Sequence, residues 1–440
     1  MRHLLIALLV LGSAGCERTT KPQADPSGTT AAPAVTPVTP GTPASTTAST
    51  TSAPAPAVPM PAPAEVKPLA AGSNAFAFDL YGRTAKTPGN QVFSPASISI
   101  ALAMTWAGAK GETAAQIQKV MHFEPGATAA WGRYAQAMSA PGRAVKLRSA
   151  NRLFGEKTAR FEQPFLDATR ASFGAPLEQV DFKVGFEPAR RHINAWVEQE
   201  TEQRIKELLP KDALDELTRL VLVNAIYFLA DWLLPFEKER TFDADFEGLT
   251  TKKVPTMHRA ARFAIAQVDG VKVLEMPYVG GDTSMLIVLP DAKNGLAAVE
   301  KTLGAGKLEA WTRALSPTMV DVALPRFELS PPTLALRDEL SAMGMPLAFD
   351  RKRADFTLIA NPPDPAEQLY IQKVFHKAFV RVDEKGTEAA AATAVVMARG
   401  GSAPMKSIEM KVDHPFLFFI RDRATGLILF MGRVADPSKT

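Results

Sequence analysis

A change in composition near residue 69 limits where this chain can build a folded core. Residues 17–68 consist almost entirely of Thr, Pro, Ala, Ser and Gly, and no charged residue occurs between Asp25 and Glu65. Such a segment has too few large apolar side chains to offset the entropy of folding, and its prolines favour extended conformations. From Leu69 onward the composition is that of a globular protein, without a second linker or an internal repeat. We therefore predict a spacer over residues 16–68 and one folded domain over residues 69–440.

The chain has a single cysteine, Cys16. Internal disulfides and paired-cysteine zinc or redox sites are therefore excluded. The six histidines are scattered, and none stands at metal-ligand spacing from another. We expect no metal and no cofactor, and a fold held together by packing and hydrogen bonds.

The first 15 residues have the three parts of a secretory signal. Arg2 is followed by an apolar run over residues 4–11 and then by small residues up to Cys16,. The apolar run is too short to span a bilayer. Small residues that end at a lone cysteine resemble the lipobox of bacterial lipoproteins, in which the cysteine thiol receives the lipid. Ser13 departs from that pattern, because Leu is usual three positions before the cysteine. An ordinary signal peptide with a chance cysteine is the alternative.

These features predict where the protein goes. We expect residues 1–15 to be removed, Cys16 to be lipidated, and the chain to be secreted across the inner membrane and anchored to the cell envelope. The residue after the cysteine is Glu17 rather than the Asp often linked to retention at the inner membrane. This favours the outer membrane, with the domain facing the periplasm or the outside. The membrane would be contacted through the lipid anchor only.

Charge and motifs exclude two large classes of function. Lys and Arg number 50 against 46 Asp and Glu, and no dense basic run provides a face for phosphates, so we expect no nucleic-acid partner,. The sequence lacks the G-x-S-x-G, H-E-x-x-H, P-loop and G-x-G-x-x-G motifs,. We therefore predict that the protein is not an enzyme, and we expect it to act as a monomer.

Periodicity predicts helices early in the domain and mostly strands later, which favours an α+β fold over a regular alternation. Helical spacing is found over residues 74–84, 97–108, 112–121, 191–209 and 334–343. Strand patterns are found over residues 220–228, 271–276, 284–289, 319–324, 369–382, 416–421 and 427–434.

Several motifs, in order along the domain, resemble those of the serpin family of protease inhibitors. The segment 369–394 resembles the hinge region of inhibitory serpins, through the run Glu384-Lys385-Gly386-Thr387-Glu388-Ala389-Ala390-Ala391-Ala392-Thr393. Further motifs that resemble the family lie over residues 93–98, 108–113, 193–198, 222–228, 324–327, 414–420 and 429–434. The resemblance covers essentially all of residues 69–440. It implies a serpin fold with three β-sheets, about eight to nine helices and an exposed reactive-centre loop.

The resemblance also implies a mechanism, in which the inhibitor is a suicide substrate. A serine protease, or alternatively a cysteine protease, cleaves the exposed loop and remains attached as an acyl-enzyme. The freed loop then inserts into the main sheet as a new central strand, and the attached protease is deformed before hydrolysis is complete.

The loop sequence meets the physical demands of insertion. No proline occurs between Glu384 and Ala403, and a central strand needs every backbone N–H. Strand alternation places Glu388 on the outer face, where its charge stays in water. Gly386 stands where the loop must pivot, and glycine tolerates the torsions. The inward face would carry uncharged residues, namely Thr387, Ala389, Ala391, Thr393, Val395 and Met397. An alanine-rich helix over residues 387–394 is the alternative.

The position of the cleaved bond has three candidates. The spacing usual in inhibitory serpins places it at Gly400–Gly401. Arg399–Gly400 lies one residue earlier and offers a side chain that a trypsin-like protease recognises, so we prefer it. Met397–Ala398 would suit an elastase-like or subtilisin-like protease.

Five residues outside the loop take roles through the resemblance. Ser94, Ser97, Asn224 and His376 fall where family members place a hydrogen-bonded cluster beneath the strands that open. Trp232 matches a residue under the top of the sheet, where insertion begins. The alternative for His376 and Trp232 is an ordinary place in the core.

Two other functions remain open. A non-inhibitory member of the family would serve as a binding module on the cell surface, but such members usually carry bulky, charged or proline residues in the hinge. A cleavable decoy would be cut without trapping its protease, and the sequence does not separate it from an inhibitor.

Overall fold

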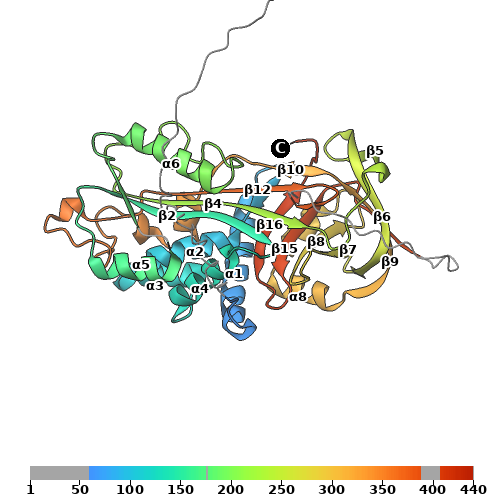
Figure 1. The fold of residues 1–440 in the computed structure, drawn as a ribbon, viewed down its shortest axis with the longest axis horizontal. Helices are drawn as coiled ribbons and strands as arrows, with labels where there is room; N and C mark the ends of the chain where they lie inside the picture. Colours follow the sequence, from blue (N-terminus) through green and yellow to red (C-terminus); the bar gives the residue numbers. More distant parts are fainter. Residues whose placement is uncertain (1–58, 175–176, 388–406, 440) are drawn as a thin grey trace, which may run out of the picture. The chain divides into compact units, whose positions relative to one another are not determined.

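The computed structural model describes residues 59–174, 177–387 and 407–439, which form two sheets with helices packed against them (Figure 1). Within these ranges there are nine α-helices: α1 Pro63–Thr84, α2 Pro95–Trp106, α3 Gly111–Met121, α4 Ala127–Ser139, α5 Gln163–Phe173, α6 Phe186–Glu200, α7 Leu296–Lys301, α8 Ala305–Arg313 and α9 Arg337–Met343. The same ranges contain three short 3-10 helices: η1 Lys238–Arg240, η2 Pro346–Phe349 and η3 Pro365–Glu367.

The first helix begins earlier than the sequence pattern predicts. α1 starts at Pro63, inside the range that we assigned to the spacer. A proline is tolerated in the first turn because its missing N–H has no partner there. Val66 and Leu69 then lie in the core at helical spacing,. Two apolar residues among prolines and alanines were too weak a pattern to extend the predicted helix.

Helix α2 lies at the centre of the domain. The side chain of Ser94 accepts a hydrogen bond from the backbone N–H of Ser97 at 3.1 Å, and Pro95 occupies the first turn. A serine cap followed by proline is a strong helix start. Every residue from Pro95 to Thr105 is buried. A helix that is apolar on all sides belongs inside a protein, and α2 packs against strand β4 (Figure 1).

Among the described residues, the first sheet has seven strands, in the order β10-β12-β13-β4-β2-β3, with β11 paired to β12. Alternate residues of β4 face opposite layers. Leu222 and Ile226 point into the main core with α2, whereas Val223 and Tyr227 pack against α6 on the other face. The strands are β2 Lys146–Glu156, β3 Glu178–Val180, β4 Leu220–Asp231, β10 Phe327–Leu329, β11 Leu334–Ala335, β12 Lys373–Val382 and β13 Gly386–Thr387.

In the described part of the chain, the second sheet contains nine strands, in the order β1-β16-β15-β8-β7-β6-β9-β14, with β5 paired to β6. We expected three sheets. Two of the three are joined into this one sheet, because the 18-residue strand β6 belongs to both. Its first part pairs with β5 and β9, and its last part pairs with β7. The strands are β1 Gln91–Phe93, β5 Thr241–Glu247, β6 Thr251–Val268, β7 Val271–Pro277, β8 Thr283–Pro290, β9 Ser316–Pro325, β14 Ile408–Lys411, β15 Phe416–Asp422 and β16 Ile428–Val434.

Two predicted helices are shorter than expected. The helix predicted over residues 191–209 ends at Glu200, and Glu202 and Gln203 have positive φ angles. The predicted helix was too long because Ile205 continues the apolar spacing. This residue is buried, but it lies in the irregular segment after the helix. The helix predicted over residues 334–343 begins only at Arg337, because the two residues of β11 pair with β12.

No helix in the described ranges is long and apolar enough to cross a bilayer.

Candidate functional site

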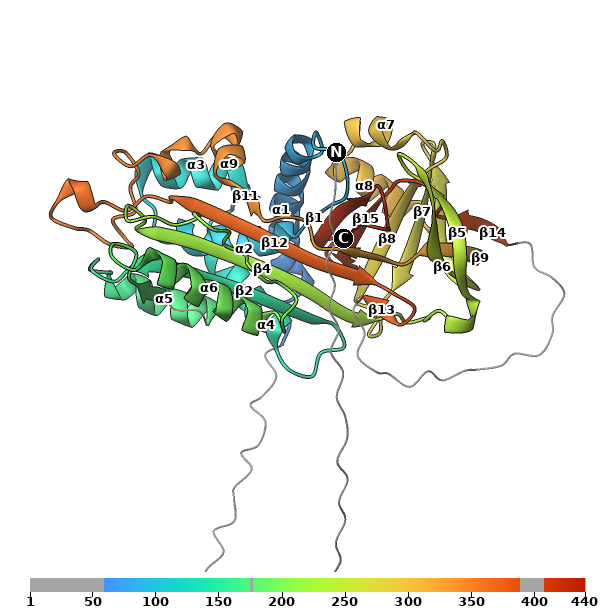
Figure 2. The same cartoon turned by 90° about the horizontal axis from the view of Figure 1, so that it is seen from above.

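A two-residue strand, β13, lies between the two central strands of the first sheet. Thr387 pairs with Val382 of β12 on one side and with Ala230 of β4 on the other, antiparallel to both. Further along, β12 and β4 pair directly and in parallel, from Lys373 opposite Val221 to residue 379 opposite 227. Figure 2 shows β12 and β4 side by side, with β13 at the end of β4. The chain therefore already starts a strand between β4 and β12.

Thr387 is completely buried at this point. Its hydroxyl lies 2.6 Å from the hydroxyl of Tyr278. The Tyr278 ring stacks on Trp232, with ring centroids 4.5 Å apart and planes 9° apart. Burial raises the pKa of Tyr278 well above its ordinary value, so its hydroxyl stays protonated,. A buried aromatic pair thus forms the wall against which the first inward residue of the hinge packs.

Trp232 also fixes the backbone before the hinge. Its indole N–H donates to the carbonyl of Asp383 at 3.0 Å, and its backbone N–H donates to the carbonyl of Lys385 at 2.7 Å. Trp232 is 2% exposed. The structure therefore places this residue at the start of the hinge, in contact with the loop base.

Glu384 is a buried carboxylate that joins the loop base to the second sheet. It is 3% exposed, and it accepts hydrogen bonds from Thr241 and from Arg326, whose Nε lies 2.8 Å away. Burial alone would raise the pKa of Glu384, but the hydrogen bonds from Arg326 and Thr241 outweigh it and lower that pKa overall,. The ionised carboxylate is therefore the stable form.

Gly386 lies in close contact with the backbone of β4. It is not among the described glycines with positive φ, and its predicted role as a pivot during insertion stays a prediction. A Cβ atom added there would lie 2.1 Å from the carbonyl oxygen of Ala230. Only glycine lets the chain approach β4 this closely.

Midway along β4 and β12, a group of buried polar residues crosses the sheet. Asn224 and His376 are opposite each other in the register, and the His376 Nδ1 hydrogen bonds to the Asn224 side-chain oxygen. The His376 Nε2 accepts from the backbone N–H of Ser94 at 3.0 Å, and the Asn224 amide donates to the carbonyl of Ser97 at 2.9 Å. The structure thus brings together all four residues that the sequence singled out. Their role in opening the sheet stays a prediction.

A fifth residue, Asn151, completes what we call the central cluster (Ser94, Ser97, Asn151, Asn224 and His376). Asn151 lies on β2 directly opposite Asn224, and its side-chain oxygen accepts from the Asn224 amide. Sequence reasoning missed it because no motif marked strand β2. Polar residues recur along β2, so nothing in its sequence distinguished Asn151 from its polar neighbours.

His376 is held in its neutral form. It is fully buried, and desolvation lowers its pKa to about 3,. The hydrogen bonds agree with a neutral ring. The Nε2 atom accepts from the Ser94 N–H, so it cannot carry the second proton of a charged imidazolium. Asn224 and His376 lie on the two strands that must separate for a loop to insert, so their hydrogen bond would have to break.

Comparisons with known proteins agree on one family. Residues 71–437 match the family model described as Serpin (serine protease inhibitor). The chain is 40% identical to leukocyte elastase inhibitor from Homo sapiens and 42% identical to that from Bos taurus. In each case 84% of this chain and 99% of the relative are covered.

The chain belongs to the serpin family. Among solved structures, uncleaved ovalbumin matches with a TM-score of 0.75 at 29% identity, over 84% of this chain and 100% of that chain. Human thyroxine-binding globulin matches with a TM-score of 0.77 at 30% identity, over 85% and 100%. The predicted serpin fold is confirmed. Since the family is one of protease inhibitors, the chain is not an enzyme.

The rest of the serpin loop lies outside the described residues. That part of the loop contains the hinge residues beyond Thr387 and the candidate bonds between Met397 and Gly401. Cys16, in the N-terminal segment, also lies outside the described residues. Those predictions remain as they were made. Within the described part of the chain, no group of three or more His, Cys, Asp or Glu side chains could hold a metal ion.

Proposed function

We propose that this serpin traps a serine protease as a suicide substrate, by inserting its cleaved loop between β4 and β12. The observation that carries the proposal is strand β13. Its residues already lie antiparallel between the two strands, with Thr387 facing the core. Insertion would extend a strand that exists, so the new hydrogen bonds form next to ordered ones.

The register of β13 predicts where the rest of the loop would go. Each step beyond Thr387 moves the partner back by one residue on both neighbouring strands. Six steps lead from Thr387 to Thr393, from Ala230 to Asn224 and from Val382 to His376. Thr393 would therefore enter the central cluster on the core side. A hydroxyl there can replace the hydrogen bond that Asn224 and His376 lose.

The same register favours the outer face for the charged hinge residue. One step beyond Thr387, Glu388 would lie opposite Leu229 and next to Arg381, which is exposed. A carboxylate beside an exposed guanidinium needs no desolvation. The sequence of the loop and the register of the sheet thus agree on which side chains face inward.

Three kinds of target protease fit the proposal. The relatives named leukocyte elastase inhibitors favour an elastase-like target. Arg399 in the loop favours a trypsin-like target, and Met397 favours an elastase-like or subtilisin-like one. A non-inhibitory binding module and a cleavable decoy are the other outcomes of the test.

The test incubates the full chain with trypsin, elastase and subtilisin, followed by a denaturing gel and mass spectrometry. We expect a covalent complex that survives denaturation, and a released C-terminal peptide whose first residue identifies the cleaved bond. Cleavage with a rise in thermal stability but without a complex would indicate a decoy. Cleavage with neither would leave a binding module and refute insertion.

We also propose that Cys16 carries a lipid and anchors the serpin to the cell envelope. The lone cysteine after a short apolar run supports this,. In bacterial cells fed a labelled fatty acid, the chain should take up label and fractionate with membranes, and a Cys16→Ala variant should do neither. Equal labelling or equal membrane recovery of both chains would refute the anchor.

A further inference from the structure

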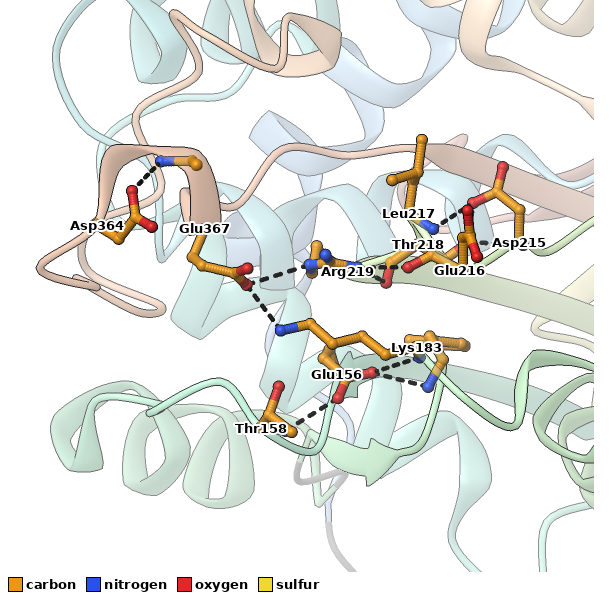
Figure 3. A network of polar contacts seen from close by, with 12 residues as sticks. Glu156, Thr158, Lys183, Asp215, Glu216, Leu217, Thr218, Arg219, Asp364 and Glu367 are labelled. Carbon is orange, nitrogen blue, oxygen red and sulfur yellow. Dashed lines mark hydrogen bonds and ion pairs between the residues drawn. The ribbon is translucent and has the colours of Figure 1, made fainter.

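A second polar cluster lies at the far end of β4 and β12, away from the hinge. We call Lys183, Asp215, Arg219, Glu367 and Gln372 the distal cluster. Glu367 accepts from Lys183 at 3.1 Å and from Arg219 at 3.3 Å. Gln372 donates to the two Asp215 oxygens at 3.0 and 3.1 Å. Figure 3 shows Glu367 reaching toward both Arg219 and Lys183 from a separate segment of the chain.

These contacts join the two sides of the prospective insertion site. Glu367 and Gln372 precede β12, whereas Arg219 immediately precedes β4. Lys183 follows β3, which pairs through β2 with β4. Separation of β4 from β12 at this end would therefore break every contact that Glu367 and Gln372 make across it.

The β4 side of the distal cluster is held independently of Glu367 and Gln372. Asp215 also accepts from the Leu217 N–H at 3.0 Å, and the Arg219 guanidinium donates to the carbonyls of Glu216 and Thr218. The Lys183 N–H donates to the buried carboxylate of Glu156 at 3.2 Å. Partners held in place give up little further entropy when a contact forms. The distal cluster is thus a prearranged set of groups that Glu367 and Gln372 meet only while the sheet is closed.

Register relates the distal cluster to the end of insertion. Ten steps beyond Thr387 lead from Ala230 to Leu220 and from Val382 to Gln372. The inserting strand would reach the distal cluster only with Met397, after it has passed the central cluster. Hinge contacts, the central cluster and the distal cluster would therefore open in that order.

We propose that the distal cluster is a positioning element that controls the last step of loop insertion, with Glu367 as its main residue. This rests on the proposed function. Because a serpin must finish insertion before its acyl-enzyme is hydrolysed, the contacts of Glu367 set how often a cleaved loop ends in a trapped protease. The hinge determines whether insertion begins, and the distal cluster determines how quickly it is completed.

The test compares Glu367→Gln with a matched control, Glu178→Gln. Glu178 also contacts two basic side chains, Arg152 and His192, but all three lie on the β4 side of the sheet. Two partly exposed ion pairs are worth about a five-fold change in rate. At saturating protease, Glu367→Gln should raise the limiting rate of covalent complex formation about five-fold, and Glu178→Gln should leave it unchanged. Gln372→Met, which opens the other half of the distal cluster, should act in the same direction.

Thermal unfolding separates this role from a merely structural one. Glu367→Gln should lower the melting temperature of the uncleaved protein and leave that of the loop-cleaved protein unchanged, because only the closed sheet has these contacts. Glu178→Gln should lower both equally. An unchanged rate for Glu367→Gln, or an equal loss of stability in both forms, would overturn the proposal. Absence of any complex with the unmodified chain would instead refute the proposed function.

Discussion

Replacing Thr387 by arginine is expected to turn the inhibitor into a plain substrate. Thr387 is fully buried, and its hydroxyl contacts that of Tyr278. An arginine there must either bury its guanidinium without a partner or withdraw β13 from the sheet. A penalty of about 3 kcal/mol for a buried, unpaired polar group slows insertion roughly 100-fold. Hydrolysis of the acyl-enzyme then wins the competition with insertion.

The measurement for Thr387→Arg is the ratio of trapped to merely cleaved inhibitor on a denaturing gel. Thr387→Ser is the matched control, because it keeps the hydroxyl near Tyr278 and adds no volume, so it should trap protease nearly as well as the unmodified chain. Trapping by Thr387→Arg at the unmodified level would show that Thr387 does not need to enter the sheet.

Acid is expected to weaken the closed protein through His376. The pKa of this residue is about 3 in the folded chain, whereas an unfolded histidine titrates near 6.5. Between these values the unfolded state binds a proton that the folded state does not. Stability is therefore fully present above about pH 6.5 and is lost as the pH falls toward 3, at about 1.4 kcal/mol per pH unit.

Urea unfolding from pH 7.5 to 4.5 measures this dependence. Carboxylates also titrate in the lower part of that range, so the comparison is with His376→Gln, whose amide can still donate to Asn224 but does not titrate. The free energy of unfolding of the unmodified chain should fall by about 3 kcal/mol more than that of the variant between pH 7.5 and 4.5. Parallel curves for the two proteins would mean that His376 is already protonated in the folded state.

Short-range patterns were sufficient to predict much of the fold. The apolar run of β4 and the bounded strands β7 and β8 were placed within a few residues, because each is a compact stretch between turn signals,. The 18-residue strand β6 was missed. It carries Lys, His and Arg along much of its length, and its exposed face hides the alternation on which such predictions depend.

The residues of the candidate site were also predicted only in part from the sequence. Family motifs selected Ser94, Asn224 and His376, which the structure brings together across three elements. They did not select Tyr278 or Glu367, whose importance comes from register and from contacts with distant segments. The Tyr278 hydroxyl meets Thr387, which is 109 residues away in the sequence. Glu367 meets Arg219 across 148 residues. No local pattern encodes such pairs.

The pairing of β1 with β16 has a consequence for how the chain is made. The first strand of the second sheet, Gln91–Phe93, takes its partner from Ile428–Val434, the last strand in the described part of the chain. Contacts this distant in sequence form slowly, because a long loop must close first. On the ribosome the partner of β1 does not exist until the chain has been synthesised through Val434. The second sheet therefore stays incomplete while the residues between β1 and β16 are being synthesised.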